Sequence, residues 1–477
     1  MPMANPGLTA DQERALAGIL AVYPLADELG RRFADAGHEL YLVGGTVRDT
    51  FLGRDQTDLD FATSATPTQT EALVRGWADH VWLTGQPFGT VSASRHGKKL
   101  EITTFRAEAY TSGSRHPDVT YAPDIETDLS RRDFTINAMA LRVPDHRFVD
   151  PFGGLRDLRD RLLRTPADPR VSFGDDPLRM VRLARFAATL GARADGAAVA
   201  AVSAMAARLD DISRERIRDE LNRLVCAAQP RKGMDLLCDT GLAERFLPEV
   251  PALRMARDPL HRHKDVYAHT LAVVERCPAD DLVLRLAALL HDVGKPATRE
   301  FHPDGRVSFH HHEVVGARMA RHRLRELRYP NETVEAVCQL VFLHLRFHGY
   351  AHGEWTDSAV RRYVRDTGTP EQLRRLNLLT RHDVTTQNKA KARWLARAME
   401  EFEARIDLLG QQEELARIKP PLDGHQIMDH LGLDPGPLVG EARQMLLEAR
   451  LDRGPIGAEE AYRLLDDWAR QRGLPGD

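Results

Sequence analysis

Residues 41–62 read YLVGGTVRDTFLGRDQTDLDFA, and this stretch decides the fold class of the N-terminal part. An apolar run ends in the adjacent glycines Gly44 and Gly45, and TVRDTFLG fits the start of a helix. Glycines at a strand-to-helix turn let backbone N–H groups approach a phosphate without a Cβ in the way. Asp58 and Asp60 follow in a run of strand character, so both carboxylates point to one face of the strand.

Two carboxylates on one face repel each other unless a cation lies between them. Oxygen ligands of this kind suit Mg²⁺, which takes one or two carboxylates together with substrate phosphates. We therefore predict a metal site at Asp58 and Asp60, with solvated aspartates in a turn as the alternative. Glu101 in KLEITTF is a candidate third carboxylate on a neighbouring strand, or a residue with a plain structural role.

Length and composition limit the class of protein. The chain has 477 residues with a net charge of -4, which predicts two to four domains and no overall basic surface for nucleic acid. The N-terminus does not resemble a signal peptide, and no apolar run approaches the roughly 18 residues of a membrane span. The four cysteines show no metal-binding spacing, so we expect a cytoplasmic protein with buried thiols.

The hydrophobic pattern changes once along the chain. A helix is expected over about 10–38, and short apolar runs between turn residues predict a mixed α/β domain up to about 165. From about 170 the apolar spacing is helical to the end. We expect four domains: a head over 1–165, a helical neck over 166–255, a third domain over 256–392 and a helical tail over 393–477.

The motif GGTVRD followed by DLD resembles nucleotidyltransferases of polymerase β type, specifically the class II tRNA nucleotidyltransferases (CCA-adding enzymes) and the related bacterial poly(A) polymerases. FGTV, EITTFRAEAY, DLSRRDFTINAMAL, DPFGGLRDL and DDPLRMVRLARFAATLG follow in family order, so the resemblance covers about 40–225. A separate resemblance to HD metal-dependent phosphohydrolases covers about 264–390. The implied fold is α+β: a polymerase β-type head with a mixed sheet, followed by all-α neck, HD and tail domains.

The resemblance implies that the 3′-hydroxyl of tRNA attacks the α-phosphate of CTP or ATP, with Mg²⁺ held by Asp58 and Asp60. It implies that the triphosphate is oriented by Gly44, Gly45, Arg48 and Asp49, although Asp49 could instead pair near Arg48. In RRDFTINA it places Arg132 near the phosphates and Asp133 on the ribose hydroxyls, with Asn137 in the same nucleotide site. A helix N-cap is the other reading of Asp133.

In DDPLRMVRLARF the resemblance makes Asp176 and Arg179 the template for the incoming base. Three residues apart on a helix, they share a face. A carboxylate only accepts and a guanidinium only donates, which matches the amino donor and ring-nitrogen acceptor of cytosine and adenine and excludes uracil and guanine. Asp176 before Pro177 also reads as a helix N-cap. Asp175 and Pro177 depart from the commoner Glu and Ala of the family.

Basic residues predict an RNA path along the neck. Arg179, Arg182 and Arg185 recur at every third position and are expected to bind the nucleotide or phosphates of the acceptor stem. SRERIRDEL matches a family segment in which Glu215 and Arg216 are expected to brace the template helix.

The third region carries a metal signature. His269, the adjacent His291 and Asp292, and Asp383 are, by resemblance, the four ligands of an HD site. Mixed imidazole and carboxylate ligands suit Mn, Fe, Ni or Co as well as Mg, so the identity of this second divalent metal stays open. His311 and His312 are candidates for a second metal or a phosphate, and His263 is an alternative first ligand.

Three functions compete. The first is CCA addition to tRNA, favoured because the loop EITTFRAEAYTSGSRHPDVTYAPDIETDLS looks full length. The second is a relative with a different product: a poly(A) polymerase, an A-adding or a CC-adding enzyme. The third is an HD phosphohydrolase of nucleotides or RNA ends whose head only binds RNA. For the HD site we expect phosphates on damaged RNA 3′ ends, such as 2′,3′-cyclic phosphates.

Overall fold

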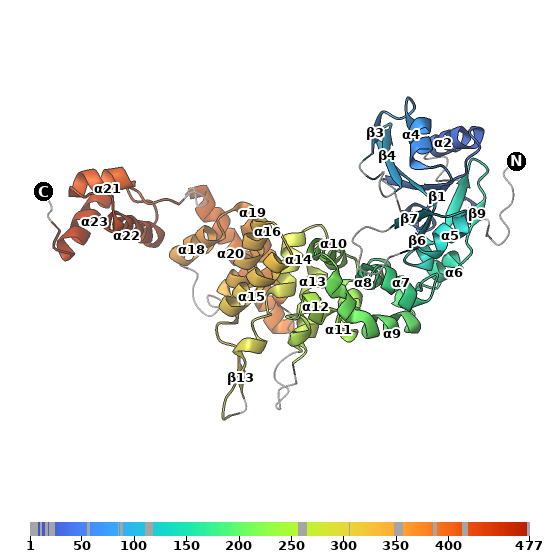
Figure 1. Ribbon diagram of the computed structural model, residues 1–477. Coiled ribbons are helices and arrows are strands. Elements are labelled where there is room, and N and C mark those ends of the chain that lie inside the picture. The colour runs from blue at the N-terminus through green and yellow to red at the C-terminus, as the bar shows by residue number, and fades with distance from the viewer. Residues whose placement is uncertain are drawn as a thin grey trace. The chain divides into compact units, whose positions relative to one another are not determined.

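The computed structural model describes residues 8–9, 12–14, 18, 24–54, 58–83, 85, 89–109, 118–255, 265–304, 306–347, 356–384, 389–412 and 418–474 (Figure 1). The chain divides into two units, Met1–Phe246 and Leu247–Asp477. The first holds the sheet and the second is almost entirely helical, so the expected α+β class is confirmed.

A seven-stranded sheet in the order β3-β4-β5-β2-β1-β8-β9 forms the centre of the first unit. β2 and β5 run parallel and the other neighbours pair antiparallel, which confirms the expected mixed sheet. The strands are β1 Leu40–Val43, β2 Asp58–Thr63, β3 His80–Trp82, β4 Thr90–Arg95, β5 Lys98–Thr104, β8 Ala140–Val143 and β9 Phe148–Val149. A separate antiparallel pair consists of β6 Arg106–Ala109 and β7 Asp118–Tyr121.

Alternation along β2 decides which face of the sheet carries the carboxylates. Leu59 and Phe61 are fully buried in the larger apolar cluster of the head, together with Leu29 and Phe33 of α2 (Pro24–Asp35). Because neighbouring side chains point to opposite faces, Asp58 and Asp60 must lie on the other face. The apolar core therefore fixes the orientation of both acidic residues.

Short helices surround the sheet, and longer ones follow it. α2 starts at Pro24, so it is the last part of the helix expected over about 10–38; several residues of 10–23 lie outside the described residues. Within FTINA, Thr135–Asn137 form the 3₁₀ turn η2 before β8. The other helices of this unit are α3 Gly45–Phe51, α4 Pro67–Val74, α5 Ile125–Ser130, α6 Gly154–Arg159, α7 Pro169–Asp175, α8 Leu178–Leu190, α9 Gly196–Met205, α10 Arg214–Val225, α11 Pro230–Asp239 and α12 Ala243–Phe246.

Helix α8 is the centre of the neck. It packs against α10 and α11, and ten of its thirteen residues are buried. A helix this deeply enclosed places its arginines against other side chains rather than in water. The strands β10 (Leu162–Leu163) and β11 (Arg193–Ala194) pair in parallel beside it.

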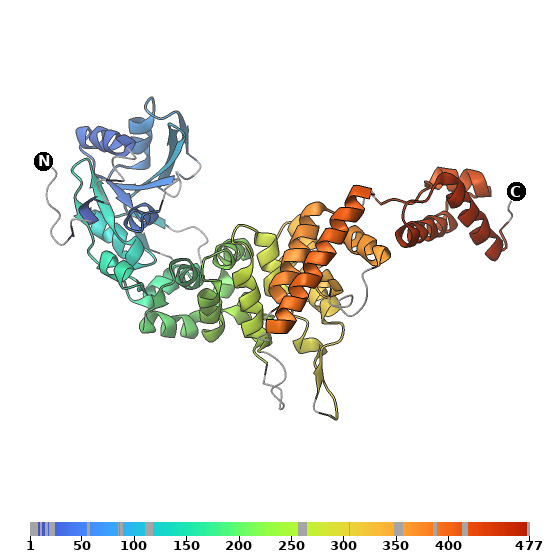
Figure 2. The same cartoon turned by 180° about the vertical axis from the view of Figure 1, so that it is seen from behind.

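The second unit contains helices α13 to α23 and one short hairpin (Figure 2). The hairpin pairs β12 (Glu300–Phe301) with β13 (Val307–Ser308). The helices are α13 Val266–Arg276, α14 Leu282–Leu290, α15 His312–Glu326, α16 Asn331–Leu343, α18 Asp357–Thr367, α19 Pro370–Asp383, α20 Lys389–Gln412, α21 Gly424–Leu431, α22 Pro437–Arg453 and α23 Ala458–Gln471. The boundary expected at 392/393 lies inside α20, whereas α21 to α23 share their own apolar cluster from Leu422 to Ala469.

Candidate functional site

The turn after β1 requires glycine for two reasons. Gly44 has φ +64°, a left-handed conformation that side chains rarely adopt, and a Cβ there would lie 2.8 Å from a guanidinium nitrogen of Arg132. The next residue, Gly45, is the first of α3. The backbone of this turn and the Arg132 side chain therefore approach each other closely, as an anion site between them requires.

Three carboxylates meet on the face of the sheet opposite the core. Asp60 on β2 lies directly beside Glu101 on β5, and Asp58 is exposed at the start of β2. Burial raises the pKa of Asp60, and the negative charges of Glu101 and Asp58 raise it further. Lys99 donates to Glu101 over 2.6 Å. A buried carboxylate whose ionisation is disfavoured by two neighbouring carboxylates fits a bound cation.

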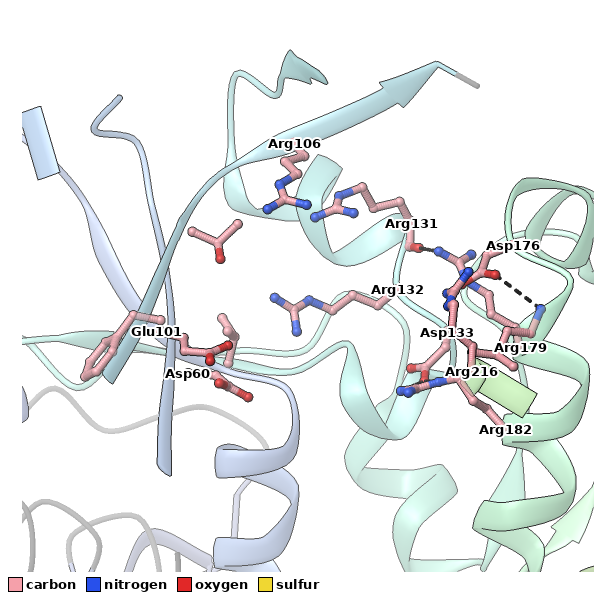
Figure 3. A pocket seen from close by; sticks show the side chains of 14 residues that line it. Asp60, Glu101, Arg106, Arg131, Arg132, Asp133, Asp176, Arg179, Arg182 and Arg216 are labelled. Atoms are coloured by element: carbon pink, nitrogen blue, oxygen red, sulfur yellow. Dashed lines mark hydrogen bonds and ion pairs between the residues drawn. The ribbon is translucent and has the colours of Figure 1, made fainter. Parts of the chain in front are cut away.

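Asp60 and Glu101 line a cavity of about 390 Å³ that reaches the first residues of the neck (Figure 3). Ten of its lining residues are charged, six of them arginines and four carboxylates, so the cavity favours an anionic ligand. The charged residues are Asp60, Glu101, Arg106, Arg131, Arg132, Asp133, Asp176, Arg179, Arg182 and Arg216. The remainder of the lining is Val43, Phe61, Thr103 and Leu178.

Asp128 holds two of these arginines, and the motif reading missed it. Its side chain is 1% exposed and accepts from Arg131 over 3.0 Å and from Arg132 over 3.1 Å. Burial alone would raise the pKa of Asp128, but the charges of Arg132 and Arg131 outweigh burial and lower it. The spacing of three and four residues along a helix was the signal that could have identified it.

Asp133 is fully occupied as an acceptor. One oxygen accepts from Asn137 over 2.9 Å and from the Phe134 N–H over 2.8 Å. The other accepts two bonds from Arg182, at 2.9 and 2.5 Å. Burial opposes ionisation, but the charge of Arg182 and these hydrogen bonds lower the pKa of Asp133 to about 2. A carboxylate has about four acceptor positions, so a ribose hydroxyl has to replace one of these donors or bind to Arg182.

Glu220 on α10 is a second residue that the motif reading missed. It is 5% exposed and pairs with Arg182 over 3.2 Å and with Arg185 over 2.5 Å. Arg185 stacks on Phe186, 3.7 Å from the ring centroid, is 9% exposed and does not line the cavity. The expected nucleotide or phosphate contact of Arg185 is therefore replaced by a buried ion pair between helices.

The expected base-reading pair faces the cavity. One oxygen of Asp176 accepts from the Leu178 N–H over 3.2 Å, which is a helix-capping contact. Its other oxygen pairs with Arg216 over 3.0 Å. Arg179 donates to the Ser172 hydroxyl over 3.0 Å and to the Arg131 carbonyl over 2.7 Å. Capping thus uses one oxygen of Asp176, and the second remains on the side of the cavity.

Eight predicted residues of the head and neck are not part of the cavity lining: Gly44, Gly45, Arg48, Asp49, Asp58, Asn137, Arg185 and Glu215. Arg48 donates to both oxygens of Asp49, at 2.8 and 2.6 Å, and to the Asn137 amide oxygen over 2.6 Å. The alternative that Asp49 pairs at Arg48 is what the geometry shows. Glu215 is exposed in the first turn of α10, so of the two residues expected to brace the template helix only Arg216 contacts Asp176.

A second candidate centre lies among the helices of the second unit. Two groups of potential metal ligands are present among the described residues: His269, His291 and Asp383, and Asp292, His312 and His344. Asp292 connects the groups, with one oxygen 3.2 Å from His291 and the other 3.4 Å from His312. His344 was missed by the motif reading, His311 is 83% exposed and belongs to neither group, and His263 lies outside the described residues.

The histidines of this centre are oriented for ligation. The Nδ1 atoms of His291, His312 and His344 each lie 2.6 to 2.8 Å from a backbone carbonyl three residues earlier. A carbonyl only accepts, so Nδ1 carries the proton and Nε2 presents its lone pair to the centre. These three Nε2 atoms are buried without a hydrogen-bond partner in the described part of the chain, as open ligand positions would be.

Charge at this centre also favours a cation. Burial opposes protonation of His291, but the carboxylates of Asp292 and Asp383 raise its pKa to about 10. Burial and the nearby His291 lower the pKa of His344 to about 3. The carboxylates that hold a proton on His291 would equally attract a divalent metal, which binds the neutral imidazole and therefore displaces that proton.

Three features define a nucleotidyltransferase head followed by an HD domain. They are the sheet with carboxylates on one face, the arginine-lined cavity and the histidine centre among the helices of the second unit. Family models agree: residues 40–164 match the poly A polymerase head domain, 195–253 a probable RNA and SrmB-binding site of polymerase A, and 261–386 the HD domain.

An A-adding tRNA nucleotidyltransferase from Deinococcus radiodurans is 34% identical over 442 residues, 90% of this chain and 95% of that protein. The chain therefore belongs to the tRNA nucleotidyltransferase family, whose enzymes depend on metal ions.

Other relatives match over less of their length. The CCA-adding enzyme of Limosilactobacillus fermentum is 42% identical over 212 residues, 44% of this chain and 52% of that protein, so the match spans about half of this relative. The Bacillus stearothermophilus CCA-adding enzyme in complex with CTP has a similar fold, with a TM-score of 0.67 at 24% identity, covering 94% of this chain and 98% of that one. No helix among the described residues is both long and apolar enough to cross a membrane.

Proposed function

We propose that the protein adds CCA to the 3′ end of tRNA from CTP and ATP without a nucleic-acid template. The observation that carries this proposal is the shared cavity: Asp60 and Glu101, the anion-binding arginines and the Asp176–Arg179 pair all line it, and Asp58 precedes Asp60 by two residues at the start of β2. One site can then bind the triphosphate, orient its α-phosphate and read its base.

Asp58 and Asp60, with Glu101 beside them, would hold Mg²⁺. When bound, the ion neutralises charge on the transferring phosphoryl group. The chain itself contributes positioning. Arg132, next to the Gly44 turn, faces the phosphates. Arg182 binds the ribose hydroxyls, because Asp133 can accept from them only after it loses one of its present donors. Holding reactants in line in this way supplies a large part of the rate enhancement of phosphoryl transfer.

Base choice is assigned to the oxygen of Asp176 that Arg216 contacts and to Arg179. Cytosine and adenine present an amino donor to the carboxylate and a ring-nitrogen acceptor to the guanidinium. Uracil and guanine present a carbonyl oxygen to the carboxylate and a ring N–H to the guanidinium, so both contacts are mismatched. An unpaired buried polar group costs about 1–3 kcal/mol, so two mismatched contacts reject the wrong base strongly. Arg216 must leave Asp176 or share it when a base binds.

A-only addition is the second candidate product, because the relative that aligns over most of both chains bears that name. The deciding experiment supplies three tRNAs that lack the whole CCA end, end after its first C or end after its second C. Each is incubated with the four triphosphates separately and together. CCA addition extends all three substrates, A-only addition extends only the last, and a poly(A) polymerase continues beyond one adenosine. Sequencing of the product ends distinguishes these outcomes.

A second activity is proposed for the second unit, favoured by two groups of three ligands that Asp292 connects. The residues are His269, His291, Asp292, His312, His344 and Asp383, and they would hold one or two divalent ions of unassigned identity. Such ions activate water for phosphoester hydrolysis. The substrates we propose are phosphates at RNA 3′ ends, including 2′,3′-cyclic phosphates that block nucleotide addition.

We further propose a cytoplasmic location and a division into head (1–165), neck (166–255), HD domain and tail. Because α20 crosses residue 393, the tail is proposed to begin after this helix. Limited proteolysis followed by mass spectrometry tests the division: cleavage is expected between the proposed domains, and preferred cleavage within α20 would contradict it.

A further inference from the structure

The β12–β13 hairpin interrupts the HD ligands in the chain. It pairs Glu300 with Ser308 and Phe301 with Val307, and it lies between the ligands Asp292 and His312. Figure 1 shows β13 in an arm that extends away from the helices around it. The hairpin is therefore attached at both ends to the candidate metal centre.

The base of the hairpin is packed tightly against that centre. Lys295, at its start, pairs with Asp292 over 2.7 Å and lies 5.8 Å from the ring centroid of Phe309 at its end. A Cβ on Gly294 would lie 2.2 Å from the His312 carbonyl oxygen. Because this contact is so close, the two ends of the hairpin cannot separate. The first residues of the arm therefore extend from the ligands in a fixed direction.

One face of the hairpin combines aromatic and cationic groups. Directly paired residues share a face, so Phe301 covers its partner Val307, which is 7% exposed, while Phe301 itself is 63% exposed. Arg299, two residues earlier and so on the same face, lies 4.5 Å from the centroid of the Phe301 ring. An open aromatic ring with a guanidinium beside it binds bases by stacking and phosphates by charge.

We propose that Phe301 stacks on the base of the nucleotide whose phosphate is held at the HD centre, with Arg299 and Lys295 directed at its phosphates. The substrate class is thereby narrowed to nucleoside phosphates and RNA 3′ ends rather than small phosphoesters. This inference rests on the second activity proposed above. Single exposed apolar residues are common, but Phe301 lies on a hairpin between two HD ligands and is accompanied by the cationic side chains of Arg299 and Lys295.

The test compares two substrates that differ only in the base: adenosine 2′,3′-cyclic phosphate and ribose 2,3-cyclic phosphate, with Mg²⁺, Mn²⁺, Co²⁺ or Ni²⁺. F301A is expected to raise KM for the adenosine substrate about tenfold or more, as loss of one stacked base does, and to leave KM for the ribose substrate unchanged. F301W should restore the wild-type KM. F342A is the matched control, because Phe342 on α16 is 41% exposed and belongs to neither ligand group.

A binding measurement separates the two proposals. In metal-stripped protein, the added tryptophan of F301W should be quenched by adenosine 2′,3′-cyclic phosphate and not by the ribose compound, whereas that of F342W should respond to neither. Quenching without any hydrolysis would retain the stacking role and refute the hydrolase. Three outcomes would overturn the proposal. They are absence of quenching, a KM for the adenosine substrate that is equal in F301A and the wild type, and an F301A variant in which only the KM for tRNA in nucleotide addition is raised.

Discussion

At the residue scale, Asp60 shows how function opposes stability. Burial and then the charges of Glu101 and Asp58 raise its pKa. The folded protein holds a proton on Asp60 more tightly than the unfolded chain does, so stability decreases as the pH rises from the ordinary carboxyl pKa of 3.8 through the raised pKa of Asp60. Above the raised pKa of Asp60 the whole loss of folding stability is present, and a bound cation offsets this loss.

D60N is therefore expected to melt at a higher temperature than the wild type at pH 7 in EDTA, because it removes a buried charge with anionic neighbours. The difference should shrink as the pH falls, and Mg²⁺ should stabilise the wild type but not D60N. Differential scanning fluorimetry across pH, with and without Mg²⁺, measures both effects. The exposed-carboxylate variant E126Q should match the wild type, and a D60N protein that melts earlier at pH 7 in EDTA would contradict the argument.

Asp176 combines a capping oxygen with a cavity oxygen, and two substitutions separate the roles. D176N keeps a good cap but places an amide where a base would meet a carboxylate, so misincorporation of UMP and GMP should rise with little change in melting temperature. D176A should also lose about 1 kcal/mol of stability. Misincorporation and melting are measured on the same preparations. If D176N selects CTP and ATP like the wild type, Asp176 is only a cap.

At the element scale, α8 and α10 are joined by a buried charge cluster. Glu220 on α10 contacts Arg182 and Arg185 of α8, and Arg182 in turn holds Asp133. Burial lowers the pKa of Arg185 to about 10 despite Glu220. The cluster thus connects helix packing in the neck with the residue expected to read the ribose.

Replacing Glu220 with alanine should cost roughly 3–5 kcal/mol, because it leaves the buried guanidinium of Arg185 without its anion, whereas Arg182 keeps Asp133. E220Q keeps the shape and part of the hydrogen bonding, so we expect a smaller loss of stability and a higher KM for ATP and CTP. Urea denaturation and initial-rate kinetics measure the two effects. The exposed E215Q is the control, and equal stability of E220A and E215Q would refute the role of the cluster.

At the scale of the whole molecule, the two candidate centres belong to different units. No described ligand of one centre is shared with the other. Each centre therefore has its own residues to bind metal, and loss of one should leave the other intact.

H291A or D292A should abolish metal-dependent hydrolysis of a cyclic phosphate and spare CMP and AMP addition to intact tRNA. D58A should do the reverse, with tRNA affinity nearly unchanged. Addition should fall by more than about 100-fold, because loss of a residue that only hydrogen-bonds to a metal ligand can already cost about that much. The assays are cyclic-phosphate hydrolysis by metal-stripped protein with each divalent ion supplied, primer extension and filter binding. No hydrolysis with any ion, in wild type that still adds nucleotides, would make the HD residues structural.

Much of the head could be predicted because its signals are local. Alternation in DLDFA fixes that Asp58 and Asp60 share a face, and the apolar residues between them determine which face it is. The glycine turn, the strands and the metal-binding residue types are equally local. These relations follow from backbone geometry within one element. The nucleotidyltransferase class and the HD ligands were predicted instead from the resemblance of the sequence motifs to those families.

The pairing of side chains across elements was decided only by the tertiary structure. Arg185 has the same spacing as Arg179 and Arg182, yet it is buried on Phe186 because α8 is covered on several sides. Asp128 and Glu220 became visible only as partners of arginines, and His344 joined Asp292 because α16 packs against α14. Local periodicity specifies the face of a helix or strand, but the partner across an interface depends on how elements pack, which no single stretch of sequence contains.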